Sequence, residues 1–97
     1  MDDKKMILVA DDDQSIRSLL QSFLESEGFR TAEAKSGRDV IPAITRHRPD
    51  VVIMDVRMPG MSGLDVLDQM KKMHIDDIPV LTMTAYGTSN VAIEAIQ

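Results

Sequence analysis

The sequence predicts one α/β domain in which helices cover a parallel β-sheet. Short apolar runs alternate along the chain with segments of helical periodicity, which is the pattern of repeated βαβ units. One run, residues 51–54, is unbroken, as in a central parallel strand buried on both faces. Acidic or hydroxyl residues end or follow several runs, and ligands of open parallel sheets bind beyond the carboxyl ends of the strands.

The composition is that of an ordinary soluble domain. The chain has 97 residues, 43% of them hydrophobic and 28% charged, so it can bury a modest core. A net charge of −5 without a run of Lys or Arg argues against binding of nucleic acid or an anionic membrane by this domain. The chain has no cysteine, which excludes disulfides and thiolate metal sites. Without a long apolar stretch or a secretory signal, we expect a cytoplasmic location.

The first strand and helix are predicted near the N-terminus. Residues 6–10 form an apolar strand, which the acidic run 11–13 closes. Asp13 is available as the N-cap of the helix that follows, and Gly28 as its C-terminal stop. The apolar face of this helix comprises Ile16, Leu19, Leu20, Phe23 and Leu24.

The second βα unit is more polar. Residues 29–34 alternate in polarity, as expected of a strand near a sheet edge with one wet face. Ser36 and Asp39 form the Ser-x-x-Asp capping signature, so we expect a helix from this cap to about His47. Pro42 lies within that helix, and we expect it to distort the helix or delay its start.

The third helix follows a Pro-Gly turn after residues 51–54, and Gly63 precedes it. Its predicted apolar face comprises Leu64, Val66, Leu67, Met70 and Met73. Residues 78–84 form a fourth strand, and an amphipathic helix begins near residue 91. That helix is still in its periodic pattern at Gln97, so we expect the polypeptide to be longer than these residues.

Candidate site residues stand at the carboxyl ends of three predicted strands. Asp11 and Asp12 follow the first strand, Asp55 ends the third, and Thr84 ends the fourth. In the flavodoxin-like strand order 2-1-3-4-5 the first and third strands are neighbours, so their carboxylates should meet. Crowded acids repel one another unless a cation neutralises them, and an all-oxygen set favours Mg²⁺ or Mn²⁺. Asp55 is the natural nucleophile, because a carboxylate can accept a phosphoryl group.

Each of these residues also has a plainer interpretation. Taken alone, the acidic run at residues 11–13 is more typical of a solvated N-capping cluster than of a metal site. Thr84 alone is typical of a β-branched strand residue. The combination of the acidic run with Asp55 beyond the adjacent strand favours the metal site.

Three stretches resemble the receiver domain of two-component response regulators. They are ILVADDD at residues 7–13, DVVIMDVRMPGMSG at residues 50–63 and MTA at residues 83–85. The likeness covers essentially the whole chain, so residues 1–97 are interpreted as a receiver domain that is incomplete at its C-terminus. It implies the CheY-like three-layer αβα sandwich with strand order 2-1-3-4, in which a fifth strand and the last helix would follow residue 97.

The resemblance also implies a role for each site residue. Asp55 would be the phosphoacceptor, and Asp12 and Asp55 would hold Mg²⁺ directly. The backbone carbonyl of Arg57 would be a third protein ligand, and Asp11 would act mostly through water. The hydroxyl of Thr84 would bind the new phosphoryl group and pull the following loop inward, which is the switch of the family.

The resemblance implies partners as well. The phosphodonor would be a histidine kinase or a phosphotransfer protein, and the output, for which transcription is the candidate, would come from another domain. Receivers of this kind assist their own phosphorylation and dephosphorylation rather than turn over a substrate. The lysine that the family places after its fifth strand is not among residues 1–97, so we expect poor phosphorylation of this piece alone, together with self-association or swapping.

Two other functions remain as alternatives. A metal-dependent phosphatase with an aspartyl nucleophile would need an acid two residues after Asp55, where Arg57 stands. A phosphorylation-independent interaction domain would keep the fold without the switch. The presence of both acids, the acceptor and Thr84 argues against this second alternative.

Overall fold

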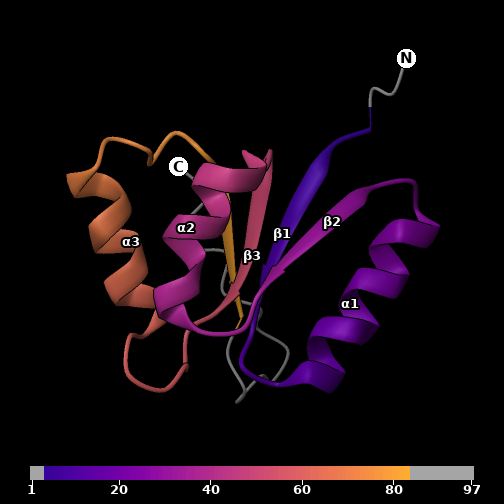
Figure 1. Ribbon diagram of the computed structural model, residues 1–97, viewed down its shortest axis with the longest axis horizontal. Coiled ribbons are helices and arrows are strands. Elements are labelled where there is room, and N and C mark those ends of the chain that lie inside the picture. Colours follow the sequence, from indigo (N-terminus) through magenta and orange to yellow (C-terminus); the bar gives the residue numbers. More distant parts are fainter. Residues whose placement is uncertain (1–3, 84–97) are drawn as a thin grey trace.

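Four parallel strands form one sheet in the order β2-β1-β3-β4 (Figure 1). This computed structural model describes residues 4–83 of the chain. The strands are β1 (Met6–Ala10), β2 (Arg30–Ala34), β3 (Val51–Asp55) and β4 (Val80–Met83). The order confirms the predicted flavodoxin-like arrangement and places β1 beside β3.

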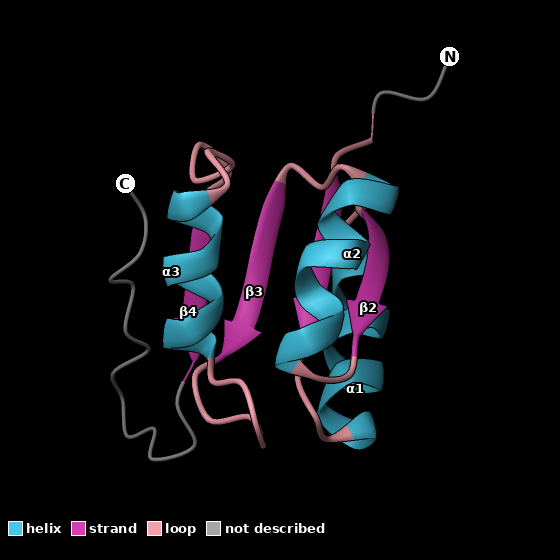
Figure 2. Ribbon diagram, turned by 60° about the vertical axis from the view of Figure 1, so that its left-hand side comes forward, coloured by secondary structure: helices cyan, strands magenta, loops and turns pink. Residues whose placement is uncertain are grey.

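The helices lie on both faces of this sheet (Figures 1 and 2). They are α1 (Gln14–Ser26), α2 (Gly37–His47) and α3 (Gly63–Lys72). α1 packs on one face, and α2 and α3 pack together on the other. Right-handed crossovers explain this division. The chain moves across the sheet in one direction from β1 to β2, and in the opposite direction from β2 to β3 and from β3 to β4. The three layers confirm the predicted fold class within residues 4–83. No helix in that part of the chain combines the length and the apolarity that a membrane span requires.

The larger core lies between the sheet and the pair α2 and α3. It contains side chains from all four strands and both helices, of which Leu8, Met54, Val40, Val66 and Met70 are almost completely buried. The smaller core beneath α1 contains Ile7, Val9 and Leu24. Successive strand residues point to opposite faces, and β1 and β3 therefore supply both cores.

The burial of β3 differs between its two faces. Val52 and Met54 are fully buried against α2 and α3, whereas Val51 and Ile53 on the α1 side are only partly buried. The prediction of a strand buried on both faces therefore holds for one face of β3. Within the described residues it is β1 that is buried along its whole length.

The inward face of α1 matches the predicted face only in part, since Leu20 and Leu24 pack against the sheet and the other three predicted residues do not. Ile16, Leu19 and Phe23 are 41%, 70% and 59% exposed, whereas Arg17 and Leu24 are buried. Residues 17, 20 and 24 form a neighbouring stripe on the same helix, and that stripe contacts the sheet. The predicted ends of the helix are correct.

Those ends follow the expected capping chemistry. Oδ1 of Asp13 accepts hydrogen bonds from the backbone N–H groups of Ser15 at 2.8 Å and Ile16 at 3.3 Å. Gly28, two residues beyond the last helical residue, has a φ of 97°, a conformation that glycine adopts without strain.

α2 begins directly after Ser36 and runs through Pro42 to His47. The delayed start was therefore a wrong prediction. The ring of Pro42 removes only one backbone hydrogen bond, in the second turn and at an exposed position. Ser36 does not cap the backbone with its side chain, because its Oγ donates to Oδ2 of Asp39 at 2.9 Å.

α3 starts with a capping box between Ser62 and Asp65. Its buried face is narrower than predicted, since Leu64 and Met73 are 58% and 49% exposed. β4 covers residues 80–83 of the predicted strand 78–84. Thr84 and the helix predicted near residue 91 lie outside the described residues.

Candidate metal and phosphoacceptor site

Three carboxylates meet where β1 and β3 end. Ala10 pairs with Met54 in the register of these strands. Asp11 and Asp55 each come next along the chain, so they lie side by side at adjacent strand ends. One carboxylate oxygen from each of Asp11, Asp12 and Asp55 lies within 4.8 Å of the others. These carboxylates, which we call the carboxylate cluster, are the acids that the sequence predicted to meet.

Asp11 is the buried member of the carboxylate cluster, with 2% of its surface exposed. Its backbone N–H donates to the carbonyl oxygen of Ala34 at 3.1 Å, and its Oδ1 accepts from the backbone N–H of Asp13 at 2.9 Å. Burial raises the pKa of Asp11, and the negative charges of Asp55, Asp12 and Asp13 raise it further, while the hydrogen bond from Asp13 opposes the shift.

The three aspartates of the acidic run at residues 11–13 occupy different structural positions. Asp12 is exposed and belongs to the carboxylate cluster. Asp13 caps α1, which is the plainer interpretation of the run and is correct for this residue. The two interpretations apply to different residues of one run.

Asp55 is held from several directions at the end of β3. Its Oδ1 accepts a hydrogen bond from the backbone N–H of Arg57 at 3.0 Å, so the chain turns back over the carboxylate. The next residue, Val56, donates to the carbonyl of Met83 at 2.9 Å and accepts from Gly63 at the same distance. A Cβ atom at Gly63 would lie 2.8 Å from the carbonyl oxygen of Asp55, so glycine permits this close approach.

Two predicted participants remain without a structural test. The carbonyl of Arg57 belongs to the turn that folds over Asp55, and its role as a metal ligand stays a prediction. Thr84 lies outside the described residues, so the role of its hydroxyl also stays a prediction.

The donor set of the carboxylate cluster fits a hard divalent cation. All three side chains offer oxygen, which suits Mg²⁺ or Mn²⁺ better than a metal that prefers sulfur or nitrogen. Like charges this close repel one another, and a bound cation would offset that repulsion. The exposure of Asp12 leaves one side of the cluster open to solvent and to a reactant.

Replacing Asp11 by asparagine should stabilise the metal-free protein at pH 7 by on the order of 1 kcal/mol, the repulsion of two unit charges about 4 Å apart in water. Because the pKa of Asp11 is raised on folding, the folded protein binds more protons than the unfolded chain between about pH 4 and that raised pKa. Stability is therefore lost as the pH rises through this window, and the full penalty is present at pH 7.

Urea unfolding with a chelator present, at pH 7 and near pH 4, measures this effect, and the advantage of Asp11→Asn should shrink at the lower pH as the wild-type carboxyl becomes protonated. The same substitution at exposed Asp77 should change little at either pH. Equal or lower stability of Asp11→Asn at pH 7 would show that burial and the neighbouring charges do not destabilise the ionised carboxylate of Asp11.

One functional candidate was missed by sequence reasoning. Arg17 is buried in α1 and donates a hydrogen bond to the backbone carbonyl of Asp11 at 2.8 Å. The only available signal was its spacing, three and seven residues before Leu20 and Leu24, which places it on the stripe that contacts the sheet.

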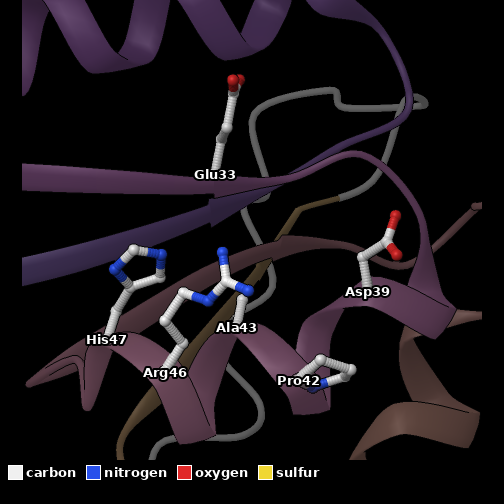
Figure 3. Close-up of a pocket in the computed structure, with 6 residues that line it drawn as sticks. All are labelled: Glu33, Asp39, Pro42, Ala43, Arg46 and His47. Carbon is white, nitrogen blue, oxygen red and sulfur yellow. The ribbon is translucent and has the colours of Figure 1, made fainter.

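Two cavities formed by described residues lie beside β2, and Glu33 lines both. One, of about 230 Å³, is lined by Glu33 on β2 and by residues of α2 that include Asp39, Arg46 and His47 (Figure 3). His47 and His74 are both exposed, as expected of solvent histidines. None of the three residues of the carboxylate cluster lines this cavity.

Comparison with known proteins gives a consistent result. A family model described as "Response regulator receiver domain" matches residues 7–97. Sporulation initiation phosphotransferase F of Bacillus subtilis is 41% identical over 81 residues, which are 84% of this chain and 64% of that protein. The DNA-binding transcriptional regulator NtrC of Klebsiella pneumoniae is 42% identical over 89 residues, 92% of this chain and 19% of that regulator. The chain thus spans less than two thirds of the first relative and about a fifth of the second.

Solved structures agree in fold. The N-terminal domain of a response regulator receiver protein from Methanoculleus marisnigri superposes with a TM-score of 0.83 at 35% identity, covering 96% of this chain and 80% of that one. The response regulator protein TrrA of Thermotoga maritima, solved in complex with Mg²⁺ and BeF, gives a TM-score of 0.77 at 37% identity, with 86% and 71% covered.

Proposed function

The chain belongs to the family of response regulator receiver domains, and from this premise we propose that it accepts a phosphoryl group on Asp55 in a Mg²⁺-dependent step. Receiver domains are signalling domains of two-component systems. The observation that supports the finer proposal is the meeting of Asp11, Asp12 and Asp55 within 4.8 Å at the carboxyl ends of adjacent parallel strands. The complex of TrrA with Mg²⁺ and BeF lends support from a relative.

In the proposed reaction a carboxylate oxygen of Asp55 attacks the phosphorus of a phosphohistidine. The new P–O bond forms as the P–N bond breaks, and the imidazole leaves with the electron pair and takes up a proton. The amide of Arg57 donates to Oδ1 of Asp55, which orients the carboxylate for this attack. Near-attack positioning of this kind is a large part of phosphoryl-transfer catalysis.

Asp12, Asp55 and the carbonyl of Arg57 would hold Mg²⁺, with Asp11 acting through water. When bound, the ion offsets negative charge on the transferring group and on the carboxylates around it. Asp11 contributes a carboxylate that burial and its hydrogen bond to Asp13 hold in place. The hydroxyl of Thr84 completes the proposal as the group that senses the phosphoryl group.

The proposal extends to partners. The phosphodonor is a histidine kinase or phosphotransfer protein in the cytoplasm, and the phosphorylated domain switches an output domain of the protein that carries it. NtrC, one of the relatives, is a DNA-binding transcriptional regulator, which supports a transcriptional output. Arg57 occupies the position at which a turnover phosphatase would need an acid.

Incubation of the full-length protein with acetyl phosphate and Mg²⁺ tests the proposal by intact mass. We expect one added phosphoryl group per chain with Mg²⁺, and at least about tenfold less when a chelator replaces it, since metal charge stabilisation is worth several kcal/mol. A mass that never increases would overturn the proposal and favour an interaction domain that works without phosphorylation.

A further inference from the structure

A buried arginine connects the carboxylate cluster to the edge of the sheet. Arg17 lies on the sheet-facing stripe of α1 and is 7% exposed. A buried charge is costly unless it is paired and hydrogen-bonded. Arg17 meets this requirement twice, because Nη1 donates to the carbonyl oxygen of Asp11 at 2.8 Å and Nε donates to Oε1 of Glu33 at 2.9 Å.

The carbonyl that Arg17 binds belongs to the peptide between Asp11 and Asp12. This peptide joins two of the three residues of the carboxylate cluster. A peptide unit is planar, so holding its oxygen also sets the direction in which the chain enters Asp12. The N–H of Asp11 is held separately by Ala34. Arg17 thus acts on the orientation of Asp12 relative to Asp11.

Glu33 holds the guanidinium in place from β2. Its side chain lies on the α1 side of the strand, and in Figure 3 it points away from α2. The ion pair is buried on the Arg17 side, where the side chain is 9% exposed, and open on the Glu33 side, at 53%. The planar fork of arginine makes both hydrogen bonds with one rigid group, a geometry that the point-like ammonium of lysine does not reproduce.

We propose that Arg17, anchored by Glu33, is a positioning residue that strengthens divalent-cation binding by holding the Asp11–Asp12 peptide. The inference rests on the proposed function to the extent that the carboxylate cluster binds a cation. Charge alone predicts the opposite effect, because a nearby guanidinium repels a divalent cation. Removal of Arg17 therefore distinguishes the two effects. Weaker cation binding indicates that Arg17 acts by positioning, and tighter binding indicates that its charge dominates.

Titration with Mn²⁺, monitored by the electron paramagnetic resonance signal of the free ion, measures the direction of this change on the full-length protein. Arg17→Met should weaken Mn²⁺ binding by about tenfold, which is the lower end of the loss in metal affinity seen when a group that orients metal ligands is removed. Arg17→Lys keeps the charge and should still weaken binding severalfold. Arg30→Met is the matched control, because Arg30 is exposed and pairs with Met6 at the opposite end of the sheet. It should leave the affinity unchanged or slightly higher.

Circular dichroism of each variant identifies a temperature at which all are folded, and the titrations are compared there. If Arg17→Met proves unfolded, Arg17→Lys carries the test. Unchanged or tighter binding by the folded Arg17 variants, together with weaker binding by Asp55→Asn, would overturn this inference and leave the proposed function intact. A wild-type protein that binds no Mn²⁺, or whose binding does not depend on Asp55, would overturn both.

Discussion

Replacing Asp55 by asparagine should reduce phosphorylation by acetyl phosphate by at least about two orders of magnitude, because the amide is a far weaker nucleophile than the carboxylate. The substitution changes neither the size of the side chain nor the ability of its oxygen to accept the Arg57 hydrogen bond. It also removes one charge from the carboxylate cluster, so the metal-free variant should be at least as stable as the wild type.

Asp50→Asn is the matched control for this experiment. Asp50 precedes the same strand at its opposite end, where Oδ2 accepts a hydrogen bond from the backbone N–H of Met6 at 2.8 Å. An asparagine can accept the same bond, and the charge change is identical. Intact mass after incubation with acetyl phosphate and Mg²⁺ should therefore show phosphorylation of Asp50→Asn and none of Asp55→Asn. Equal phosphorylation of both variants would exclude Asp55 as the acceptor.

Replacing Leu8 by alanine should lower the free energy of unfolding by about 2–5 kcal/mol, through lost burial and the cavity left behind. Leu8 is 0% exposed at the centre of the larger core, on a strand with a neighbour on each side. A loss of this size is a large part of the whole stability of a typical domain.

Leu19→Ala makes the same chemical change on α1, where Leu19 is 70% exposed. We expect a change below about 0.5 kcal/mol there. Urea unfolding monitored by circular dichroism measures both variants. Similar losses for the two would mean that Leu19 faces the core, as the periodicity of α1 first indicated, and that the orientation of this helix described above is wrong.

Strand positions could be predicted because their signals are local, whereas the sheet order was taken from the flavodoxin-like arrangement that a βαβ chain of this kind favours. The apolar run of β1 and that of β3 each end at an aspartate, and the observed strands match both runs closely. Repeated βαβ units then restrict the topology, because parallel crossovers are right-handed. The meeting of Asp11 and Asp55 follows from that topology alone.

Details that depend on packing were not predictable in the same way. Periodicity identified an apolar arc on α1, but two neighbouring stripes fit within it, and contact with the sheet selects the stripe that contains Arg17. An arginine at such a position looks like a surface residue in sequence, because the burial of its charge depends on Glu33, sixteen residues away. The partial exposure of Ile53 likewise depends on which elements cover its face of the sheet.

We propose that Asp55, and no other acid of the carboxylate cluster, receives the phosphoryl group. Borohydride reduces an aspartyl phosphate to homoserine, so mass spectrometry of the reduced and digested protein locates the acceptor. We predict homoserine at position 55 after treatment with acetyl phosphate and Mg²⁺, and aspartate at positions 11 and 12. Homoserine at either of those two positions, or its absence from position 55 in a protein that has gained phosphate, would contradict the account.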